Sequence, residues 1–536
     1  MLEAMPKGDA PRLKLDGARV TVMGLGLHGG GAAAARFCAE RGAKVTVTDL
    51  QREEKLAGSI ETLSDLPIRF VLGRHEPEDF TGADIVVKNP AVPRNARYLA
   101  MAERVETDIS LFLRECAVPI IAVTGTKGKS TTVSAIHYGL TRAGYRSHLG
   151  GNITISPLTF LDEVNGESDA APGPADAGGR RVVVLEVSSF QLGDLLLTPH
   201  PDLFKPRVSV ITNIFEDHQD YYGSMEAYVA DKRIIYRFQD RTDTFIYNAD
   251  DAYGTAFDAE AAAEPRGIRT LGVSARGLPA GVAGGQLTAQ GGVVTDADRR
   301  LETLLPRELA VAGAHMRVNL LTAALALYAY GVDANEAGHA VAGFTGIPHR
   351  LERVGAVNGV VFVNDSAATI PDAAARAVDA FHLPVYLIAG GSDKNGSFDG
   401  FPAIIAAAER TYLLEGTGTD RILDLANLAG TSNPAVAEGP FGSLREAVHA
   451  AFRDASAAPD RLPETDRNAG VARTVEDDRI GGADRAVVLL SPGCASFGMF
   501  RNEFDRGRQF VDIVEEIIQR SGDARNAHGA RDPGGH

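Results

Sequence analysis

The sequence predicts an α/β protein of three domains, and three observations support this prediction. The chain has 536 residues, which is more than one ordinary domain holds. Apolar runs alternate with helix-like segments from residue 19 to about residue 113, as in parallel sheets joined by crossover helices. Two further α/β units start at residue 119 and after residue 350. We therefore predict domains at residues 1–116, 117–346 and 347–536.

The composition restricts the classes of function. Apolar residues make up 44% of the chain and charged residues 23%, which is ordinary for globular proteins. The net charge of −16 argues against nucleic acid or an anionic membrane as a partner, because both are polyanions. Three widely spaced cysteines without a Cys-x-x-Cys pair fit a reducing compartment rather than disulfides or zinc. No run reaches transmembrane length, so we expect a cytoplasmic protein.

The first domain places a glycine-rich loop directly after its first strand. "ARVTVMG" (18–24) is predicted to be a buried strand, and Gly24, Gly26 and Gly29 follow in a Gly-x-Gly-x-x-Gly pattern. Asp49 stands twenty residues after Gly29, at the end of the next strand. In this dinucleotide fingerprint, glycines let backbone N–H groups approach a diphosphate, and the carboxylate accepts bonds from a ribose or base. Alone, the pattern favours NAD, and a glycine-rich turn without a ligand is the alternative.

The second domain opens with a shortened phosphate loop. An apolar run ending at Val123 is followed by "TGTKGKST". A standard P-loop has glycine five residues before Gly128, where this chain has Val123. Lys129 can still neutralise phosphate charge, Ser130 can bind Mg²⁺, and Gly125 leaves room for backbone donors. A glycine–lysine turn without a ligand is the alternative.

Two further strand ends carry polar side chains that suit this loop. Glu186 ends the strand in "VVVLEVSSFQL", and His218 stands just past the strand in "VSVITNIFEDHQD". Ligands bind at the carboxyl ends of parallel strands, so we predict that Lys129, Ser130, Glu186 and His218 lie in one crevice. The alternatives are a capping role for Glu186 and a structural role for His218.

The rest of the chain is predicted to complete the fold. "GGQLTAQGGVV" (284–294) is predicted to be a β-hairpin, and the third domain to contain strands at 385–391 and 486–493. Three stretches rich in Gly, Pro, Ala and charged residues are expected to be loops or an untethered tail without chemistry: residues 165–181, 455–485 and those from 521.

These residues resemble the Mur ligases, ATP-dependent amide ligases of peptidoglycan precursor synthesis, over nearly the whole chain. "LEVSSFQL" and "SPGCAS" are most similar to the glutamate-adding members, and the family's own loop has the shorter G-T-x-G-K-[ST] form. The matching stretches are 124–131, 150–153, 185–192, 216–232, 247–251, 348–352, 364–369, 390–394 and 491–507. The resemblance implies an N-terminal Rossmann-like domain that binds UDP, a central P-loop ATPase-like parallel sheet and a C-terminal Rossmann-like domain that binds the amino acid.

The resemblance also implies the reaction. ATP would phosphorylate the L-alanine carboxylate of UDP-N-acetylmuramoyl-L-alanine, and the amine of D-glutamate would attack the acyl phosphate to give an amide, ADP and phosphate. It implies two Mg²⁺ ions and a carbamylated lysine at Lys232, and we expect a monomer. A carbamate would supply the anionic oxygen ligand that a neutral His218 cannot.

The resemblance assigns site residues position by position. The implied catalytic residues are Lys129, Glu186, His218 and Lys232, and the implied Mg²⁺ ligands are Ser130, Glu186, His218 and Lys232. The implied ATP contacts are Gly125, Thr126, Lys127, Gly128, Lys129, Ser130, Thr131 and Asn319, with Arg350 and Asp365 from the third domain. The implied contacts to the UDP-linked substrate are Leu27, His28, Asp49, Asn152, Ser188 and Gln191. The implied glutamate contacts are Thr369, Lys394, Ser496 and Phe497.

Three alternatives stay open at this point. A ligase similar to folylpolyglutamate synthase shares the ATPase architecture and also adds glutamate. An NAD-dependent oxidoreductase is favoured by the first loop but leaves Lys129, Glu186 and His218 without a role. A binding protein without catalysis is the third.

Overall fold

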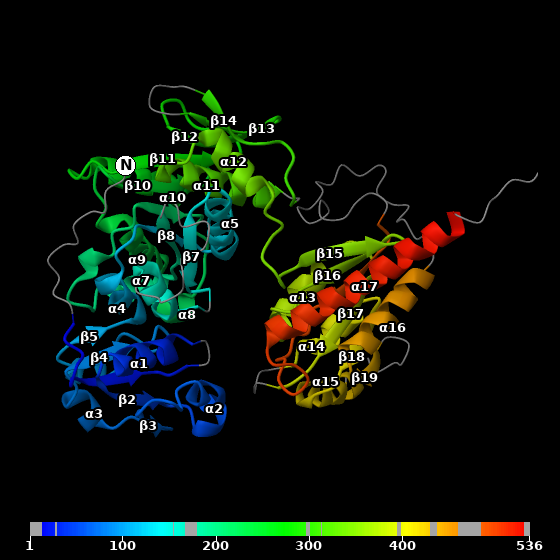
Figure 1. The fold of residues 1–536 in the computed structure, drawn as a ribbon, viewed down its shortest axis with the longest axis horizontal. Helices are drawn as coiled ribbons and strands as arrows, with labels where there is room; N and C mark the ends of the chain where they lie inside the picture. The colour runs from blue at the N-terminus through cyan, green and yellow to red at the C-terminus, as the bar shows by residue number, and fades with distance from the viewer. Residues whose placement is uncertain are drawn as a thin grey trace, which may run out of the picture. The chain divides into compact units, whose positions relative to one another are not determined.

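The computed structural model describes most of the chain, and the described residues form two compact units (Figure 1). The described residues are 13–26, 29–153, 155–166, 180–295, 301–311, 314–393, 398–428, 437–458 and 484–529. Unit 1 comprises Met1–Ala310 with Met316–Phe344, and unit 2 comprises Val311–His315 with Thr345–His536. Unit 1 contains two sheets and unit 2 contains one, so the chain is α/β throughout, as predicted.

The first sheet of unit 1 is parallel, with strand order β3-β2-β1-β4-β5. Its strands are β1 (Arg19–Met23), β2 (Lys44–Asp49), β3 (Arg69–Leu72), β4 (Ile85–Lys88) and β5 (Val105–Glu106). Its helices are α1 (Gly30–Glu40), α2 (Glu53–Glu61), α3 (Pro77–Thr81) and α4 (Asp108–Glu115), with a 3₁₀ turn η1 (Leu99–Met101). The chain order reverses beside β1, and in open α/β sheets ligands bind at such a point, beyond the carboxyl ends of the strands.

The second sheet of unit 1 has nine strands in the order β14-β13-β12-β11-β10-β9-β6-β8-β7. The parallel part is β6 (Ile120–Thr124), β7 (Arg146–Gly151), β8 (Arg181–Glu186), β9 (Val208–Ile211), β10 (Thr244–Asn248) and β11 (Arg269–Ser274). β12 (Gly284–Thr288), which runs parallel to β11, forms the predicted hairpin with β13 (Gly291–Thr295), and β14 (Leu301–Leu305) pairs antiparallel to β13. β6, which leads into the phosphate loop, lies among neighbours and is buried along its whole length.

Helices and short 3₁₀ turns complete this part of unit 1. They are α5 (Lys129–Arg142), α6 (Leu161–Asn165), α7 (Ser189–Leu195), α8 (Gln219–Tyr222), α9 (Met225–Arg237), α10 (Ala252–Ala263), α11 (Ala314–Tyr330) and α12 (Ala334–Ala342), with η2 (Pro157–Phe160) and η3 (Pro201–Leu203).

One hydrophobic core joins the two sheets of unit 1. It runs from β1 and α1 through the buried side chains of α4, including Ile109 and Phe112, to β8 and to Leu192 and Leu195 of α7. Thr107 starts α4 with a capping box, in which its hydroxyl accepts from the N–H of Ser110 at 3.0 Å. Because the core is continuous, packing fixes the first sheet against α7 and the side of the second sheet that contains β8.

The sheet of unit 2 is covered on both faces by helices. Its strand order is β15-β16-β20-β17-β18-β19, and only β15 is antiparallel to its neighbour. The strands are β15 (Glu352–Val357), β16 (Val360–Asn364), β17 (Val385–Gly390), β18 (Arg410–Leu414), β19 (Ala437–Phe441) and β20 (Ala486–Leu490). The helices are α13 (Pro371–Asp379), α14 (Phe401–Ala407), α15 (Thr417–Leu428), α16 (Leu444–Ala457) and α17 (Glu503–Gly529).

Successive residues along the strands of unit 2 point to opposite faces of the sheet and pack in two separate hydrophobic cores. Val361 and Val363 pack with α13, α14 and α15, while Val360 and Phe362 pack with α16 and α17. This alternation is what a parallel sheet between two helix layers requires. The expected untethered tail from residue 521 is wrong in part, because α17 continues to Gly529.

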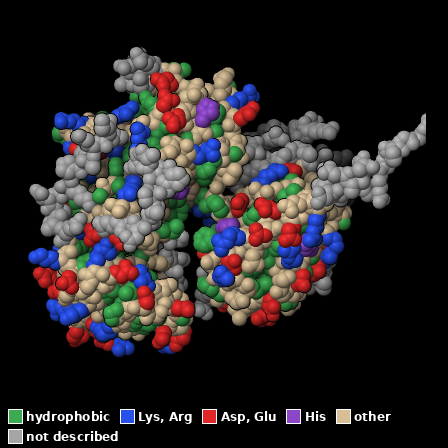
Figure 2. Space-filling model, in the orientation of Figure 1, with side chains coloured by type: hydrophobic (Ala, Val, Ile, Leu, Met, Phe, Trp, Pro, Cys, Tyr) green, Lys and Arg blue, Asp and Glu red, His purple; other side chains and the backbone are tan. Residues whose placement is uncertain are grey.

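The surface and the helices bear on the expected partners. On the face shown in Figure 2, acidic and basic side chains are interspersed over both units. Among the helices in the described part of the chain, none is both long and apolar enough to cross a bilayer.

Candidate active site

The phosphate loop connects β6 to α5, and its backbone needs glycine at two positions. Gly125 has a φ of 142° and Gly128 a φ of 81°. A Cβ on Gly125 would overlap the hydroxyl of Thr212, and one on Gly128 would lie 2.8 Å from Oδ1 of Asn319. The loop therefore lies directly against both neighbours, and the predicted ATP residue Asn319 is brought to it by α11.

The end of the neighbouring strand β9 holds this loop in place. The N–H of Thr126 donates to the carbonyl of Asn213 at 2.9 Å, and the N–H of Lys127 donates to Asn213 Oδ1 at 2.8 Å. The hydroxyl of Thr212 donates to the carbonyl of Lys127 at 2.6 Å. Thr212 and Asn213 were not among the residues predicted from the sequence. Two polar residues directly after an apolar strand, at the edge where the loop lies, were the available signal.

Two lysines meet at one carbonyl of the loop. Lys129 Nζ donates to the carbonyls of Gly125 and Thr126, both at 3.0 Å. Lys232 Nζ, from α9, donates to the same Gly125 carbonyl at 2.9 Å. Lys232 is 1% exposed, and its Nζ lies 4.6 Å from the centre of the Tyr228 ring. Burial, and next the charge of Lys129, lower the pKa of Lys232 to about 7.

Glu186 ends β8 beside the loop, as predicted, and has one carboxylate oxygen without a donor. Asn152 follows β7 and donates through Nδ2 to Glu186 Oε1 at 2.8 Å. Glu186 Oε2 is buried and has no hydrogen-bond partner among the described residues. A buried carboxylate oxygen without a partner is costly, and a bound cation is one explanation. The structure thus brings the predicted residues Asn152 and Glu186 together.

His218 lies at the same edge in a left-handed conformation. Its φ is 52°, which is uncommon for a residue with a side chain. Its ring lies 5.0 Å from that of Phe190 in α7 and 6.3 Å from that of Tyr228 in α9. Asp217 Oδ1 lies 3.9 Å from His218 Nδ1. The ring is therefore held between α7 and α9, whose residues also include Lys232.

Only two of the four predicted metal ligands, Glu186 and His218, are side chains of the His, Cys, Asp and Glu types. The described residues contain no group of three or more His, Cys, Asp and Glu side chains that could hold a metal ion. Mg²⁺ prefers oxygen ligands and takes several of them from phosphates and water. The donor set of Glu186 and Ser130 fits that requirement if further oxygens come from the nucleotide.

Two predicted substrate residues already have structural partners. Ser188 caps α7: its hydroxyl accepts from the N–H of Gln191 at 3.2 Å, and its own N–H donates to Gln191 Oε1 at 3.0 Å. This is a capping box, and the pattern Ser-x-x-Gln was visible in the sequence. Because Ser188 and Gln191 stand in the first turn of α7, any contact of theirs with a substrate lies at the start of that helix.

Asp49 also has structural partners. Its Oδ2 accepts from the N–H groups of Leu25 at 2.8 Å and Gly26 at 3.2 Å, and its Oδ1 accepts from the N–H of Gln51 at 2.8 Å. Asp49 therefore shapes the glycine-rich loop. Of the other predicted residues, Leu27, His28 and Lys394 lie outside the described residues.

In unit 2, the predicted residues lie on loops at one edge of the sheet. Thr369 follows β16, and Ser496 and Phe497 follow β20. The N–H of Gly493 donates to the carbonyl of Ala368 at 2.9 Å and so joins these two loops. Ser496 is buried, whereas Phe497 is 54% exposed. Thr369, Ser496 and Phe497 therefore share the carboxyl edge of adjacent parallel strands.

Asp365 and Arg350 differ in their surroundings. Asp365 is buried, and it accepts from the Ser491 hydroxyl at 2.7 Å and from the N–H of Leu351 at 3.1 Å. Arg350 is exposed and lies between His349 and Leu351, which have φ values of 63° and 43°. Strained backbone of this kind tends to occur at functional turns.

The site defines a class of protein, the nucleotide-binding proteins of the phosphate-loop type. Its glycine-rich loop places Lys129 and Ser130 at the start of a helix, beside Glu186 at the end of the neighbouring strand. Residues 123–327 match the Mur ligase middle domain. The chain is 35% identical to the UDP-N-acetylmuramoylalanine–D-glutamate ligase of Treponema pallidum (strain Nichols), over 95% of this chain and 99% of that protein. It is 38% identical to the ligase of the same name from Roseiflexus sp. (strain RS-1), over 94% and 100%.

The solved structure of a UDP-N-acetylmuramate–alanine ligase from Thermotoga maritima matches with a TM-score of 0.47 and 18% identity, covering 93% of this chain and 100% of that one. On the sequence relatives, the chain belongs to the Mur ligase family. The resemblance stated from the motifs is thereby confirmed.

Proposed function

We propose that this chain is an ATP-dependent, ADP-forming ligase that joins D-glutamate to UDP-N-acetylmuramoyl-L-alanine in peptidoglycan precursor synthesis. One observation carries the proposal: the chain matches nearly the full length of relatives that bear this enzyme name. The stretch that matches the Mur ligase middle domain, residues 123–327, contains the phosphate loop, Glu186 and Lys232. It favours the ligase over both the folylpolyglutamate-type and the oxidoreductase alternatives.

The first step is phosphoryl transfer from ATP to the L-alanine carboxylate. An oxygen of the carboxylate forms a bond to the γ-phosphorus, and the bond to ADP breaks. Both reactants are anions, so the chain must mainly position them and neutralise charge. Lys129 Nζ lies at the loop and is the cation suited to this role. The N–H groups at the start of α5 supply further donors.

The second step forms the amide. The amine of D-glutamate attacks the acyl carbon, phosphate leaves, and the amine loses a proton. Thr369, Lys394, Ser496 and Phe497 are proposed to hold the glutamate. In support, the three of them that the structure describes, Thr369, Ser496 and Phe497, lie on loops at one edge of the unit 2 sheet. Arg350 and Asp365 are proposed to contact ATP, and the strained turn at Arg350 favours a functional role.

Mur ligases use Mg²⁺, and the residues of unit 1 fit it. Glu186 Oε2 is a buried oxygen in need of a partner, and Ser130 follows Lys129 at the head of α5. Ser130 and Glu186 would hold one ion, and His218 and Lys232 a second. When bound, Mg²⁺ would neutralise charge on the transferring phosphoryl group.

Lys232 is proposed to carry the carbamate. In that modification the neutral amine forms an N–C bond with CO₂, and one proton leaves. The pKa of Lys232 is lowered to about 7, so a large share of the amine is neutral near pH 7. No carboxylate of the described residues lies within ion-pair distance of its Nζ. Both observations support the modification.

The test is ADP release by the purified full chain with three substrate sets. We expect release with UDP-N-acetylmuramoyl-L-alanine plus D-glutamate, and much less when L-glutamate replaces D-glutamate. Release only with a folate plus L-glutamate would support the folylpolyglutamate-type alternative. An NADH absorbance change without ADP release would support the oxidoreductase. Sedimentation of the same preparation tests the expected monomer.

A further inference from the structure

A set of buried charges joins the first sheet of unit 1 to two helices of the active-site side. Lys88 ends β4, and Arg94 lies in the loop that follows. Their partners are Asp194 in α7 and Asp231 in α9. α7 begins beside Ser188, and α9 carries Lys232, so both helices belong to the proposed site. None of these four charged residues has a role in the function described so far.

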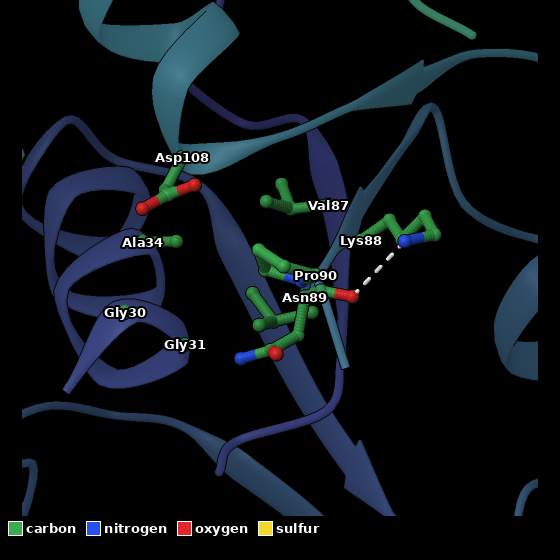
Figure 3. A pocket seen from close by; sticks show the side chains of 9 residues that line it. Gly30, Gly31, Ala34, Val87, Lys88, Asn89, Pro90 and Asp108 are labelled. Carbon is green, nitrogen blue, oxygen red and sulfur yellow. Dashed lines mark hydrogen bonds between the residues drawn. The ribbon is translucent and has the colours of Figure 1, made fainter. Parts of the chain in front are cut away.

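Lys88 and Asp194 form the most deeply buried pair. Lys88 Nζ lies 2.5 Å from Asp194 Oδ2, and their side chains are 0% and 1% exposed. Lys88 Nζ also donates to the carbonyl of Asn89 at 3.2 Å, as Figure 3 shows. Asn89 in turn lies against the glycine-rich loop, because a Cβ on Gly24 would be 2.9 Å from its Cβ.

Arg94 bridges both helices with a single guanidinium. Its Nε donates to Asp194 Oδ1 at 3.0 Å, its Nη1 donates to Asp231 Oδ1 at 3.1 Å, and its Nη2 donates to Asp231 Oδ2. The hydroxyl of Tyr222 donates to the same Asp231 Oδ2 at 2.8 Å. Gly193 leaves the space for this arrangement, because a Cβ there would overlap the guanidinium.

The four charges balance, with two cations facing two anions. Removing one partner of such a buried set leaves an uncompensated charge, whereas a set of apolar side chains of similar volume is often as stable. Stability alone therefore explains the set poorly. Its fixed geometry suits a role in holding three elements in one arrangement.

The contacts run without a break from one glycine-rich loop to the other. Asn89 packs on the first loop, and Lys88 and Arg94 bind α7 and α9. Lys232 directly follows Asp231 in α9, and its Nζ donates to the carbonyl of Gly125 in the phosphate loop. In the proposed reaction, the first loop holds the UDP end of the substrate and the second holds ATP.

We propose that Lys88, Arg94, Asp194 and Asp231 are positioning residues that hold α7 and α9 against the first sheet. They thereby set the distance between the UDP-linked carboxylate and the phosphate loop. This inference rests on the proposed function, since it assigns the two ligands to the two loops. Arg94 is the central member because it alone contacts both helices through their carboxylates.

The experiment compares Arg94→Met with a matched control, Arg104→Met. Arg104 is 28% exposed and pairs with the buried Glu106 at 2.8 Å, while Arg94 is 25% exposed, but the Arg104 pair stays within the first sheet. We expect Arg94→Met to lower kcat on the order of 10²-fold, as small displacements of reactants do, with little change in the KM for ATP. Arg104→Met should keep kcat. An equal loss in both variants, or none in Arg94→Met, overturns the proposal.

A double-mutant cycle tests the coupling directly. Asp231→Asn keeps the size of the side chain and serves if Arg94→Met does not fold. We expect the double variant of Arg94→Met and Asp231→Asn to be no slower than the slower single variant, because both remove one contact. Losses that multiply overturn the proposal.

Hydrogen exchange separates failure of this inference from failure of the proposed function. Without any substrate, Asp231→Asn should raise exchange in both α7 and α9 but not in α12, while the Arg104→Met control should leave α7 and α9 unchanged. Unchanged exchange in α7 and α9 of Asp231→Asn overturns the inference. The proposed function fails instead if the unsubstituted chain shows no turnover with UDP-N-acetylmuramoyl-L-alanine and D-glutamate.

Discussion

Two lysines of unit 1, Lys88 and Lys232, are equally buried but face different neighbours. Lys88 Nζ lies 2.5 Å from Asp194 Oδ2. Lys232 Nζ instead donates to the Gly125 carbonyl, beside Lys129, with no carboxylate of the described residues within ion-pair distance. Burial lowers the pKa of both amines. Asp194 opposes this lowering for Lys88. For Lys232, the charge of Lys129 adds to the lowering, and the more weakly acting Asp217, Asp231 and Glu186 oppose it.

The difference shows that burial alone does not make a lysine reactive. A buried ammonium beside a carboxylate keeps its charge and its partner, so it serves as a structural contact. A buried amine beside a second cation is available in its neutral form, which is the form that reacts with CO₂. Lys88 and Lys232 thus differ in the group that their ammonium contacts, which is a carboxylate for Lys88 and a carbonyl shared with a second lysine for Lys232.

The largest effect is expected from Lys129→Ala, which removes the cation next to Lys232. The charge of Lys129 faces the loop where phosphoryl charge would develop, so its loss should lower turnover by about 10²–10⁴-fold. Circular dichroism and the Tm should show a folded protein. Retention of more than about half the turnover would contradict the ATP-loop assignment.

Lys232→Ala should remove most of the activity, and an added small acid should restore part of it. The same acid should not restore activity to a Lys88 variant. Acetate or formate can place a carboxylate oxygen where the carbamate oxygen would lie, so either acid should restore part of the turnover. Lys88→Ala is the matched control, since the same acids have no such role beside Asp194. An inactive Lys232→Ala variant that no acid restores would leave the carbamate without support.

The free energy of unfolding should depend on Lys88 more than on Lys232, whereas the chemistry should depend on Lys232. Lys88→Met leaves Asp194 with one cation fewer, and breaking a buried pair lowers the free energy of unfolding by about 3–5 kcal/mol. Lys232→Met removes a buried amine that has no carboxylate partner, so stability should stay equal or rise. Urea denaturation at pH 7 measures both. A large loss in Lys232→Met would show that its contact with Gly125 is mainly structural.

The pH dependence follows from the lowered pKa of Lys232. The folded pKa of about 7 lies below the unfolded value, so below pH 7 the folded amine is protonated and cannot take up CO₂. Each pH unit below 7 reduces the neutral fraction about tenfold. Activity should therefore fall below pH 7 and recover when CO₂ is raised at fixed pH. Acid-rescued Lys232→Ala should lack this CO₂ response, and the same response in that variant would contradict the assignment.

Much of the fold was predictable because the strands are short apolar runs between glycine-rich turns. The predicted hairpin formed as β12 and β13, and Glu186 ends β8 beside the phosphate loop, as strand-end reasoning requires. α17 was missed in part because its last residues, 521–529, are mostly Gly, Ala and polar side chains. The helix continues to Gly529, although the composition favoured a tail.

The charge network was not predictable from spacing. Asp194 lies 106 residues after Lys88, and Asp231 lies 137 residues after Arg94, so no local pattern joins them. The only local signal was Lys88 itself, a charged residue ending the apolar strand β4. Pairing between distant segments depends on how two sheets pack, and the sequence alone does not report that packing.

The smallest effect concerns a third lysine, Lys394, which extends the comparison to unit 2. It is the single lysine between residues 345 and 536, where arginine supplies the other fixed cations. Its proposed role, gripping a carboxylate of glutamate, needs a charged ammonium, unlike that of Lys232. Loss of one charge-assisted hydrogen bond corresponds to about 10-fold or more in affinity, so Lys394→Ala should raise the KM for D-glutamate by that factor with little change for ATP. The control is Arg445→Ala, which breaks an exposed ion pair with Glu516 in the same unit. This variant should change neither the KM for D-glutamate nor the KM for ATP. Equal changes in both KM values for Lys394→Ala, or none, would place the glutamate site elsewhere.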